Sequence, residues 1–223
     1  MSKSIVAVMP CLGRQERTID LVPRLIRTAG TEDWELSLVV DNDNPLHSAL
    51  LRAITPQRIP VNILRTNQPD ERGYWYAMRR GCKESNAPLV VNLANDLLPG
   101  RDWLRRALEA YNQRFADGLG GVMGFNDGVH MGGQAAHFLA ARAFLRQWFG
   151  DDEWPLAYQH NFGDTEICRR AQAAGRFAVA PWAVLYHDHP VSGGANDEVY
   201  QRGAAGWKQD EALFKQRSAQ WSF

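Results

Sequence analysis

The 223-residue chain carries 25 basic and 25 acidic side chains, so its formal net charge is zero. Such a chain does not rest its affinity on broad attraction to nucleic acid or anionic lipid, although it can still contain a local basic groove. Its three cysteines are widely spaced and form no Cys-x-x-Cys pair, which disfavours zinc and a disulfide framework. The sequence contains no run of about 18 apolar residues, the length that a membrane-spanning helix needs. We therefore expect a soluble, cytoplasmic protein.

Short apolar runs alternate with helix-period segments in the first half of the chain. We expect strands at residues 4–9, 35–41, 61–66 and 88–94, and helices at 15–29, 46–54 and 73–85. A further helix follows the fourth strand, and Pro99 suits its first turn. Strands separated by single helices are typical of parallel β-α-β units, so we expect an α/β fold whose sheet is covered on both faces.

The second half is less regular. We expect a glycine-dense strand in 118–133, a strand running into a helix in 137–150, a helix at 164–175 ending at Gly175, a pair of strands in 177–190 and a charged amphipathic helix at 195–218. The chain then divides into one domain, residues 1–190, and a helical tail, residues 191–223, that packs on it.

Polar residues follow several of the expected parallel strands, where ligands of such sheets bind. Asp41 ends the second strand, a position that fits either contact with a nucleobase or ribose, or an Asx-turn. Asp96 ends the fourth strand and fits either a hard divalent cation or a helix cap. Because Asp96 precedes Pro99 by three residues, it is early for a simple cap.

Arginines and aromatic residues gather in the segment 71–84. Gly73 opens the expected helix, and Arg72 and Arg79 lie where they fit a diphosphate at the helix N-terminus. The same composition fits an amphipathic helix with solvated arginines, or a surface that stacks a single nucleotide strand.

Two later motifs carry groups capable of acid–base or metal chemistry. Asp164 and Glu166 begin a helix, where acids commonly complement the helix dipole, but where Asp164 also fits a general base. His187 and His189 lie on one side of an extended segment, which fits half of a metal site or a plain turn.

The order of these motifs resembles the inverting, family-2-like glycosyltransferases of the GT-A fold. The segments that carry the resemblance are "MPCLGR", "VVDN", "GYWYAMRRG", "ANDLLP", "GDTEICRR" and "LYHDHP". They span residues 5 to about 190. The family's pattern is broken at Asn95, which replaces the first acid of the metal motif, at Gly163, which replaces a glutamate, and at Arg79, which replaces an asparagine. The tail also resembles those of small phage-type glycosyltransferases.

The resemblance implies a Rossmann-like GT-A fold with a central, mostly parallel sheet, and a transfer from a UDP- or GDP-sugar to an acceptor hydroxyl with inversion. Asp164 is the implied base, and Asp96 and His187 are the implied ligands of Mn²⁺ or Mg²⁺. The implied donor-binding residues are Pro10, Cys11, Arg14, Asp41, Arg72, Gly73, Arg79 and Asn95. We assign Trp75, Glu166 and His189 to the acceptor.

Other functions remain compatible with the sequence. A nucleotidyltransferase also places an acid and a metal beside a nucleotide, although the loop after the first strand has one glycine, Gly13, where such enzymes carry several. A nucleotide- or glycan-binding module without activity is compatible with Asn95 and Gly163. The acceptor is open among a glycan, a small molecule and a hydroxymethylated base in phage DNA.

Overall fold

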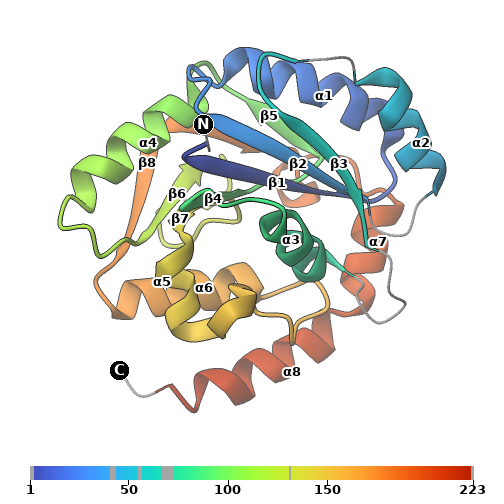
Figure 1. The fold of residues 1–223 in the computed structure, drawn as a ribbon. Helices are drawn as coiled ribbons and strands as arrows, with labels where there is room; N and C mark the ends of the chain where they lie inside the picture. Colours follow the sequence, from blue (N-terminus) through green and yellow to red (C-terminus); the bar gives the residue numbers. More distant parts are fainter. Residues whose placement is uncertain (1–2, 41–43, 55–56, 67–72, 131, 222–223) are drawn as a thin grey trace.

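The computed structural model describes residues 3–40, 44–54, 57–66, 73–130 and 132–221. Within these residues eight strands form one sheet, in the order β3-β2-β1-β4-β7-β6-β8-β5 (Figure 1). The strands are β1 (Ile5–Cys11), β2 (Trp34–Val40), β3 (Val61–Arg65), β4 (Leu89–Asn92), β5 (Leu97–Pro99), β6 (Val122–Asn126), β7 (Phe138–Ala141) and β8 (Phe177–His187).

Eight α-helices are described, of which α1 to α6 pack around the sheet and α7 and α8 form the tail (Figure 1). They are α1 (Gln15–Thr28), α2 (Asn44–Ala53), α3 (Tyr74–Lys83), α4 (Trp103–Arg114), α5 (Arg142–Phe149), α6 (Gly163–Ala173), α7 (Glu198–Ala205) and α8 (Trp207–Ser218), with short 3-10 helices η1 (Gly150–Asp152) and η2 (Pro190–Ser192). Among the described residues, no helix is both long and apolar enough to cross a membrane.

The two halves of the sheet differ in strand direction. β1 pairs in parallel with β2 and β4, and β2 in parallel with β3, as the β-α-β pattern predicts. β7 then runs antiparallel between β4 and β6, β8 is parallel to β6, and β5 is antiparallel to β8. The predicted α/β class is confirmed, and the second half of the sheet is mixed because β7 is antiparallel to both of its neighbours, β4 and β6.

Alternate residues of β1 face two separate cores. Ile5 and Met9 pack with residues of α1 and α4, whereas Val6 and Val8 pack with residues of α3, α5 and α6. Figure 1 shows α1 and α4 on one side of the sheet and α3, α5 and α6 on the other. A strand that is buried on both faces consists of consecutive apolar residues, and this pattern is easily recognised in the sequence.

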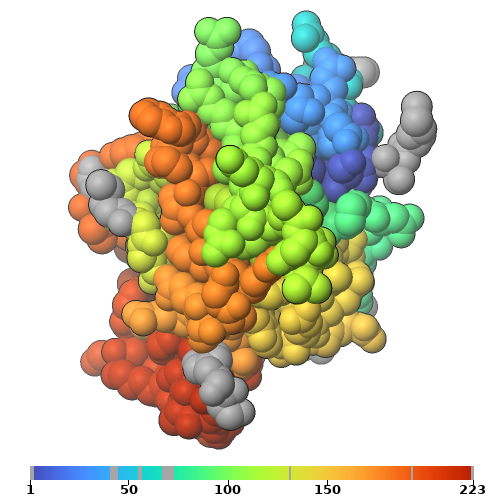
Figure 2. Space-filling view, turned by 90° about the vertical axis from the view of Figure 1, so that its left-hand side faces the viewer, coloured from blue at the N-terminus to red at the C-terminus, as the bar shows by residue number. Residues whose placement is uncertain are grey.

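The segments after the parallel half lie close together on one side of the molecule. Figure 2 shows α4, in green, lying against β8, in orange, with the red tail at the lower end of this face. α4 and β8 therefore enclose the core around Trp103, whose ring packs edge-on against Trp34 with 5.8 Å between ring centroids.

Three elements differ from the sequence-based expectation. Leu97–Pro99 is strand β5, paired with Leu185–His187 of β8, so Pro99 is not in a helix and α4 begins at Trp103. The expected pair of strands in 177–190 is the single strand β8, which carries a bulge. The expected tail helix at 195–218 is two helices, α7 and α8, which meet at Gly206.

Candidate active site

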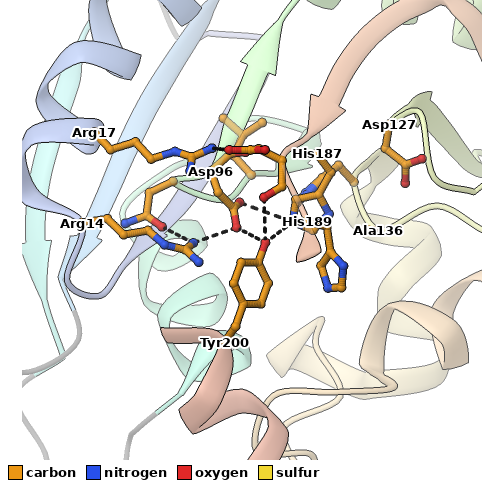
Figure 3. Close-up of polar contacts among 12 residues, drawn as sticks. Arg14, Arg17, Asp96, Asp127, Ala136, His187, His189 and Tyr200 are labelled. Carbon is orange, nitrogen blue, oxygen red and sulfur yellow. Dashed lines mark hydrogen bonds and ion pairs between the residues drawn. The ribbon is translucent and has the colours of Figure 1, made fainter. Parts of the chain in front are cut away.

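Asp96 lies between β4 and β5 at the carboxyl edge of the parallel strands, and its side chain is 3% exposed. Its Oδ2 is 2.7 Å from the guanidinium of Arg14, which is itself buried in the loop between β1 and α1 (Figure 3). Arg14 has a left-handed backbone, with φ of 50°, a conformation that costs a non-glycine residue about 1–2 kcal/mol. Strained backbone conformations of this kind are more common at functional sites than elsewhere.

Asn95 holds the same loop from the other side. Its amide oxygen accepts a hydrogen bond from Arg14 at 3.2 Å, and its amide nitrogen donates to the Thr18 hydroxyl at 3.1 Å. Both bonds are buried or partly buried. An aspartate at this position would keep the first bond and lose the donor of the second, so the departure from the family's acidic pair has a structural reason.

The second oxygen of Asp96 points toward His187. Oδ1 lies 3.4 Å from His187 Nε2, and within the described residues it accepts no hydrogen bond although it is buried. Oδ2 also accepts a hydrogen bond of 2.5 Å from the Tyr200 hydroxyl, which comes from α7. Burial alone raises the pKa of Asp96, but His187, Arg14 and Tyr200 together hold that pKa well below its ordinary value. Asp96 is therefore a carboxylate at neutral pH.

Asp96 Oδ1 and His187 Nε2, which face each other at 3.4 Å, are the atoms that would hold a divalent cation here, and the Tyr200 hydroxyl also lies 3.3 Å from Nε2. The described part of the chain contains no group of three or more His, Cys, Asp or Glu side chains arranged to hold a metal. Magnesium and manganese commonly use one or two carboxylates and complete their shell with substrate phosphates and water. The buried Oδ1 of this ionised aspartate, facing His187 Nε2, fits such an ion, provided that a diphosphate supplies further oxygens.

Asp164, the implied base, has an electrostatic environment opposite to that of Asp96. It is the second residue of α6, and its Oδ1 accepts a hydrogen bond from the backbone of Thr165 at 2.8 Å. Within the described residues it forms no ion pair. Burial raises the pKa of Asp164 above its ordinary value, while His130 and His160 act in the other direction. A carboxylate of raised pKa without a fixed cation is suited to accept a proton.

The loop before Asp164 is held by the tail. The carboxylate of Asp210 in α8 is 1% exposed and accepts hydrogen bonds from the backbone nitrogens of Gln159, His160 and Asn161, at 3.0, 3.0 and 2.8 Å. The loop enters α6 through Phe162, which has a φ of 64°. Asp210 thus positions the helix start that carries Asp164.

Trp75 explains the glycine that replaces the family's glutamate. Its indole is 2% exposed and donates to the His160 carbonyl at 3.2 Å. A Cβ built at Gly163 would meet the Trp75 ring at 2.3 Å, so no side chain fits there. The same burial removes Trp75 from contact with an acceptor, which corrects the assignment made from the sequence.

Glu166 also lies away from solvent. It is 0% exposed and bonds to Arg170 at 2.8 Å, to Arg217 at 2.8 and 2.9 Å, and to the Tyr158 hydroxyl at 2.6 Å. This buried ion cluster ties α8 to α6. Glu166 is therefore a structural acid, and we leave it out of the acceptor site.

The remaining implied residues have mixed environments. Cys11 is fully buried, with its thiol toward the Met9 carbonyl, so a nucleotide could meet only its backbone. Arg79 pairs with Asp152 at 2.7 Å, on the α5–η1 side of α3. Pro10 is partly buried next to Cys11 in β1. Asp41 and Arg72 lie outside the described residues.

Gly73 and His189 have clear local roles. Gly73 precedes α3 with a φ of 96°, and a Cβ there would lie 2.5 Å from the Gln159 carbonyl oxygen, so only glycine fits. His189 begins η2 and accepts a hydrogen bond from the backbone of Val191 at 3.1 Å. Its ring lies edge-on to those of His187 and Tyr200, with centroids 5.1 and 4.9 Å apart. His189 therefore borders the Asp96 site.

Four residues near the two carboxylates were missed from the sequence. Asp197 binds Arg14 through two bonds, of 2.5 and 2.9 Å, and Tyr200 follows it by one helical turn. Arg17 donates to the Asp96 carbonyl at 2.9 Å and pairs with Asp188 at 2.9 Å. His130, held by the buried Asp127 at 2.7 Å, acts on the pKa of Asp164. The three-residue spacing of Arg14 and Arg17 was the one available signal.

The sheet carries an ionised aspartate at its carboxyl edge, and a second, less stabilised aspartate lies at a helix start. The family model described as "Glycosyl transferase family 2" matches residues 6–177, and the chain belongs to this family. A search of the curated proteins found no match.

Solved structures share the fold. The mannosyltransferase PcManGT from Pyrobaculum calidifontis, in complex with GDP-Man and Mn²⁺, superposes with a TM-score of 0.74 at 14% identity, covering 100% of this chain and 66% of that one. S. aureus TarS (residues 1–349), in complex with UDP-GlcNAc, gives a TM-score of 0.59 at 12% identity, covering 83% and 58%. The chain thus spans about two thirds or less of the length of these glycosyltransferases, which have the same GT-A fold.

Proposed function

We propose that this protein transfers a sugar from a UDP- or GDP-sugar to an acceptor hydroxyl, with inversion at the anomeric carbon and with help from Mn²⁺ or Mg²⁺. The observation that carries the proposal is the pair of aspartates in opposite environments. Asp96 is ionised beside Arg14 and His187, whereas Asp164 has a raised pKa and no ion pair among the described residues. The ionised Asp96 suits a cation that binds the donor's diphosphate, and Asp164 suits removal of a proton.

The donor's diphosphate is proposed to lie over the strand ends near Arg14 and Asp96. The Arg14 guanidinium binds the carboxylates of Asp96 and Asp197, and a phosphate oxygen would bind it in place of Asp197. A bound divalent cation would supply electrostatic stabilisation of the departing nucleoside diphosphate, and Asp96 Oδ1 and His187 Nε2 would hold it. The complexes of PcManGT with GDP-Man and Mn²⁺ and of TarS with UDP-GlcNAc support a nucleotide-sugar donor.

Asp164 is proposed to take the proton of the acceptor hydroxyl as that oxygen attacks the anomeric carbon. A single attack from the face opposite the leaving group inverts the configuration. Its raised pKa favours proton uptake, and Asp210 fixes the loop from which its helix begins. Residues 1–190 would then form the catalytic domain and residues 191–223 a tail that completes it.

The acceptor is proposed to be a glycan or a small molecule. A DNA acceptor depends on free arginines beside exposed aromatic rings in α3. However, Arg79 pairs with Asp152, Arg80 pairs with Glu84, and Trp75 is buried. These contacts neutralise the cluster locally, so it does not favour nucleic acid.

The experiment is a thermal-shift screen of UDP- and GDP-sugars with Mn²⁺, followed by product analysis for each stabilising compound. Stabilisation grows with ligand concentration over its dissociation constant, so one plate identifies base and sugar together. We expect slow hydrolysis that releases nucleoside diphosphate and free sugar. Release of pyrophosphate would show a nucleotidyltransferase, and binding without any turnover would show an inactive binding module.

A further inference from the structure

The two tail helices are attached to the domain in different ways. α8 is anchored by buried groups, since Asp210 is 1% exposed and Arg217 pairs with the fully buried Glu166. α7, in contrast, has no buried residue among those described. We call residues 197–205, which are Asp197 and α7, the strap. The strap is held mainly by polar contacts, whereas α8 is built into the structure.

The strap's strongest contacts are with the proposed donor site. Asp197 accepts two hydrogen bonds from Arg14, and its Oδ1 also caps α7 by accepting from the backbone of Val199 and Tyr200 at 3.1 Å. Tyr200 donates to Asp96 Oδ2 at 2.5 Å, and the Arg14 guanidinium lies 4.6 Å from the centre of its ring. Figure 3 shows the Tyr200 hydroxyl reaching the carboxylate from the side of the tail.

These contacts occupy both charges that a donor would use. A diphosphate oxygen and the Asp197 carboxylate are both anions that can take the bidentate face of Arg14. The Tyr200 hydroxyl binds Asp96 Oδ2 and also lies 3.3 Å from His187 Nε2, the nitrogen that a divalent cation would use. Burial and the charge of Asp96 raise the pKa of Tyr200, so its hydroxyl remains a proton donor at neutral pH. The strap and the metal-bound donor therefore compete for the Arg14 guanidinium and for His187 Nε2.

We propose that the strap is an autoinhibitory contact that donor binding displaces: Asp197 takes the place of a diphosphate oxygen on Arg14, and the Tyr200 hydroxyl takes the place of the cation beside His187 Nε2. The inference rests on the proposed function, because it assigns regulation to that same site. α8 stays attached through Asp210 and Arg217 while α7 moves, and Gly206 at their junction is the point where the chain turns.

The test combines two measurements on the full chain, with Mn²⁺ and UDP or GDP as the probes. Hydrogen exchange of the strap amides is measured with and without Mn²⁺ and nucleotide. Nucleotide affinity in Mn²⁺ is measured by calorimetry for the wild type, Tyr200→Phe and Asp197→Asn. Tyr76→Phe is the matched control, since it also removes a tyrosine hydroxyl, and that hydroxyl makes no hydrogen bond within the described residues.

We expect faster exchange in the strap when Mn²⁺ and nucleotide are added, and no change in α8. We also expect Tyr200→Phe and Asp197→Asn to bind nucleotide about three- to tenfold more tightly, because a larger fraction of molecules is open. Slower exchange in the strap, unchanged exchange under saturating probe, or weaker binding by Tyr200→Phe would overturn the inference.

The outcomes separate this inference from the proposed function. If the strap is released by Mn²⁺ and nucleotide but no nucleotide sugar is hydrolysed or transferred, the contact is autoinhibitory and the proposed activity is wrong. If sugar is transferred while the strap stays protected and Tyr200→Phe binds like the wild type, the activity stands and the strap is a fixed wall of the site.

Discussion

Asp96 and Asp164 are both partly or fully buried aspartates, yet their surroundings push their pKa values in opposite directions. Asp96 is surrounded by Arg14, His187 and the Tyr200 hydroxyl, and its pKa is lowered. Asp164 has one backbone donor and lies in a desolvated position, and its pKa is raised. Two identical side chains thus differ in proton affinity: Asp96 is a carboxylate at neutral pH because of partners that are distant in sequence, whereas burial raises the pKa of Asp164.

The largest expected effect comes from removing the carboxylate of Asp164, the proposed general base. Asp164→Asn should lower the turnover of donor by about 10²–10⁴-fold, the usual contribution of a general base. In the wild type, activity should rise with pH through a pKa above the ordinary aspartate value, since the carboxylate is the active form and burial raises that pKa. A pH–rate profile checks this. An Asp164→Asn protein with normal turnover would remove the distinction between the two aspartates.

The next effect is on stability and concerns Asp96. Asp96→Ala leaves the buried Arg14 with one carboxylate fewer, and should cost about 3 kcal/mol in denaturant unfolding at pH 7. Because the folded pKa of Asp96 is lowered, its contribution is fully present above the ordinary carboxyl pKa of about 4 and is lost as the pH falls below it. The difference between mutant and wild type should therefore shrink at pH 3. A constant difference would contradict the ion-pair explanation.

Glu166 differs from Asp96 and Asp164 because its contacts stabilise the fold. Glu166→Gln weakens its bonds to Arg170 and Arg217 and should lower the free energy of unfolding by about 2 kcal/mol. Nucleotide affinity, measured below the melting range, should stay unchanged. A selective loss of acceptor use with normal stability would instead restore the acceptor role expected from the sequence.

Gly163 tests why this chain departs from its family. Gly163→Ala places a methyl group against the Trp75 indole and should destabilise the protein by about 1–3 kcal/mol through overpacking. In a protein that already carries Trp75→Leu, adding Gly163→Ala should lower the free energy of unfolding by less than it does in the wild type. If Gly163→Ala is neutral by thermal unfolding, the ring is not what excludes a side chain there.

The smallest expected effect is at Asn95. Asn95→Asp keeps the bond from Arg14 but gives up the donor to Thr18, which should cost about 1 kcal/mol. Its Mn²⁺ affinity in the presence of nucleotide, measured by calorimetry, should change by less than about threefold. A tenfold gain would mean that the missing second acid limits metal binding.

The sequence predicts the parallel half of the fold because its strands are continuous apolar runs separated by periodic helices. It fails at β5, where a three-residue strand contains Pro99, and at β8, where Pro181 and a bulge make one strand look like two. These are places where pairing with a distant strand outweighs local preference.

The same limit applies to the site. Asp96 and Asp164 are found from their places in the chain order, but Tyr200 contacts Asp96 across 104 positions and Asp197 contacts Arg14 across 183. Local patterns carry no information about such contacts. The first-turn acids Asp164 and Glu166 look alike in sequence, and only packing separates the proposed base from the buried ion cluster.

The most direct test of the two-aspartate account is calorimetry of UDP and GDP in the presence of Mn²⁺ for the wild type, Asp96→Asn and Asp164→Asn. We predict that Asp96→Asn loses at least about tenfold in nucleotide affinity, because the cation loses its carboxylate ligand, whereas Asp164→Asn binds like the wild type while failing to turn over donor. Equal affinity for all three proteins, or an equal loss in both variants, would contradict it.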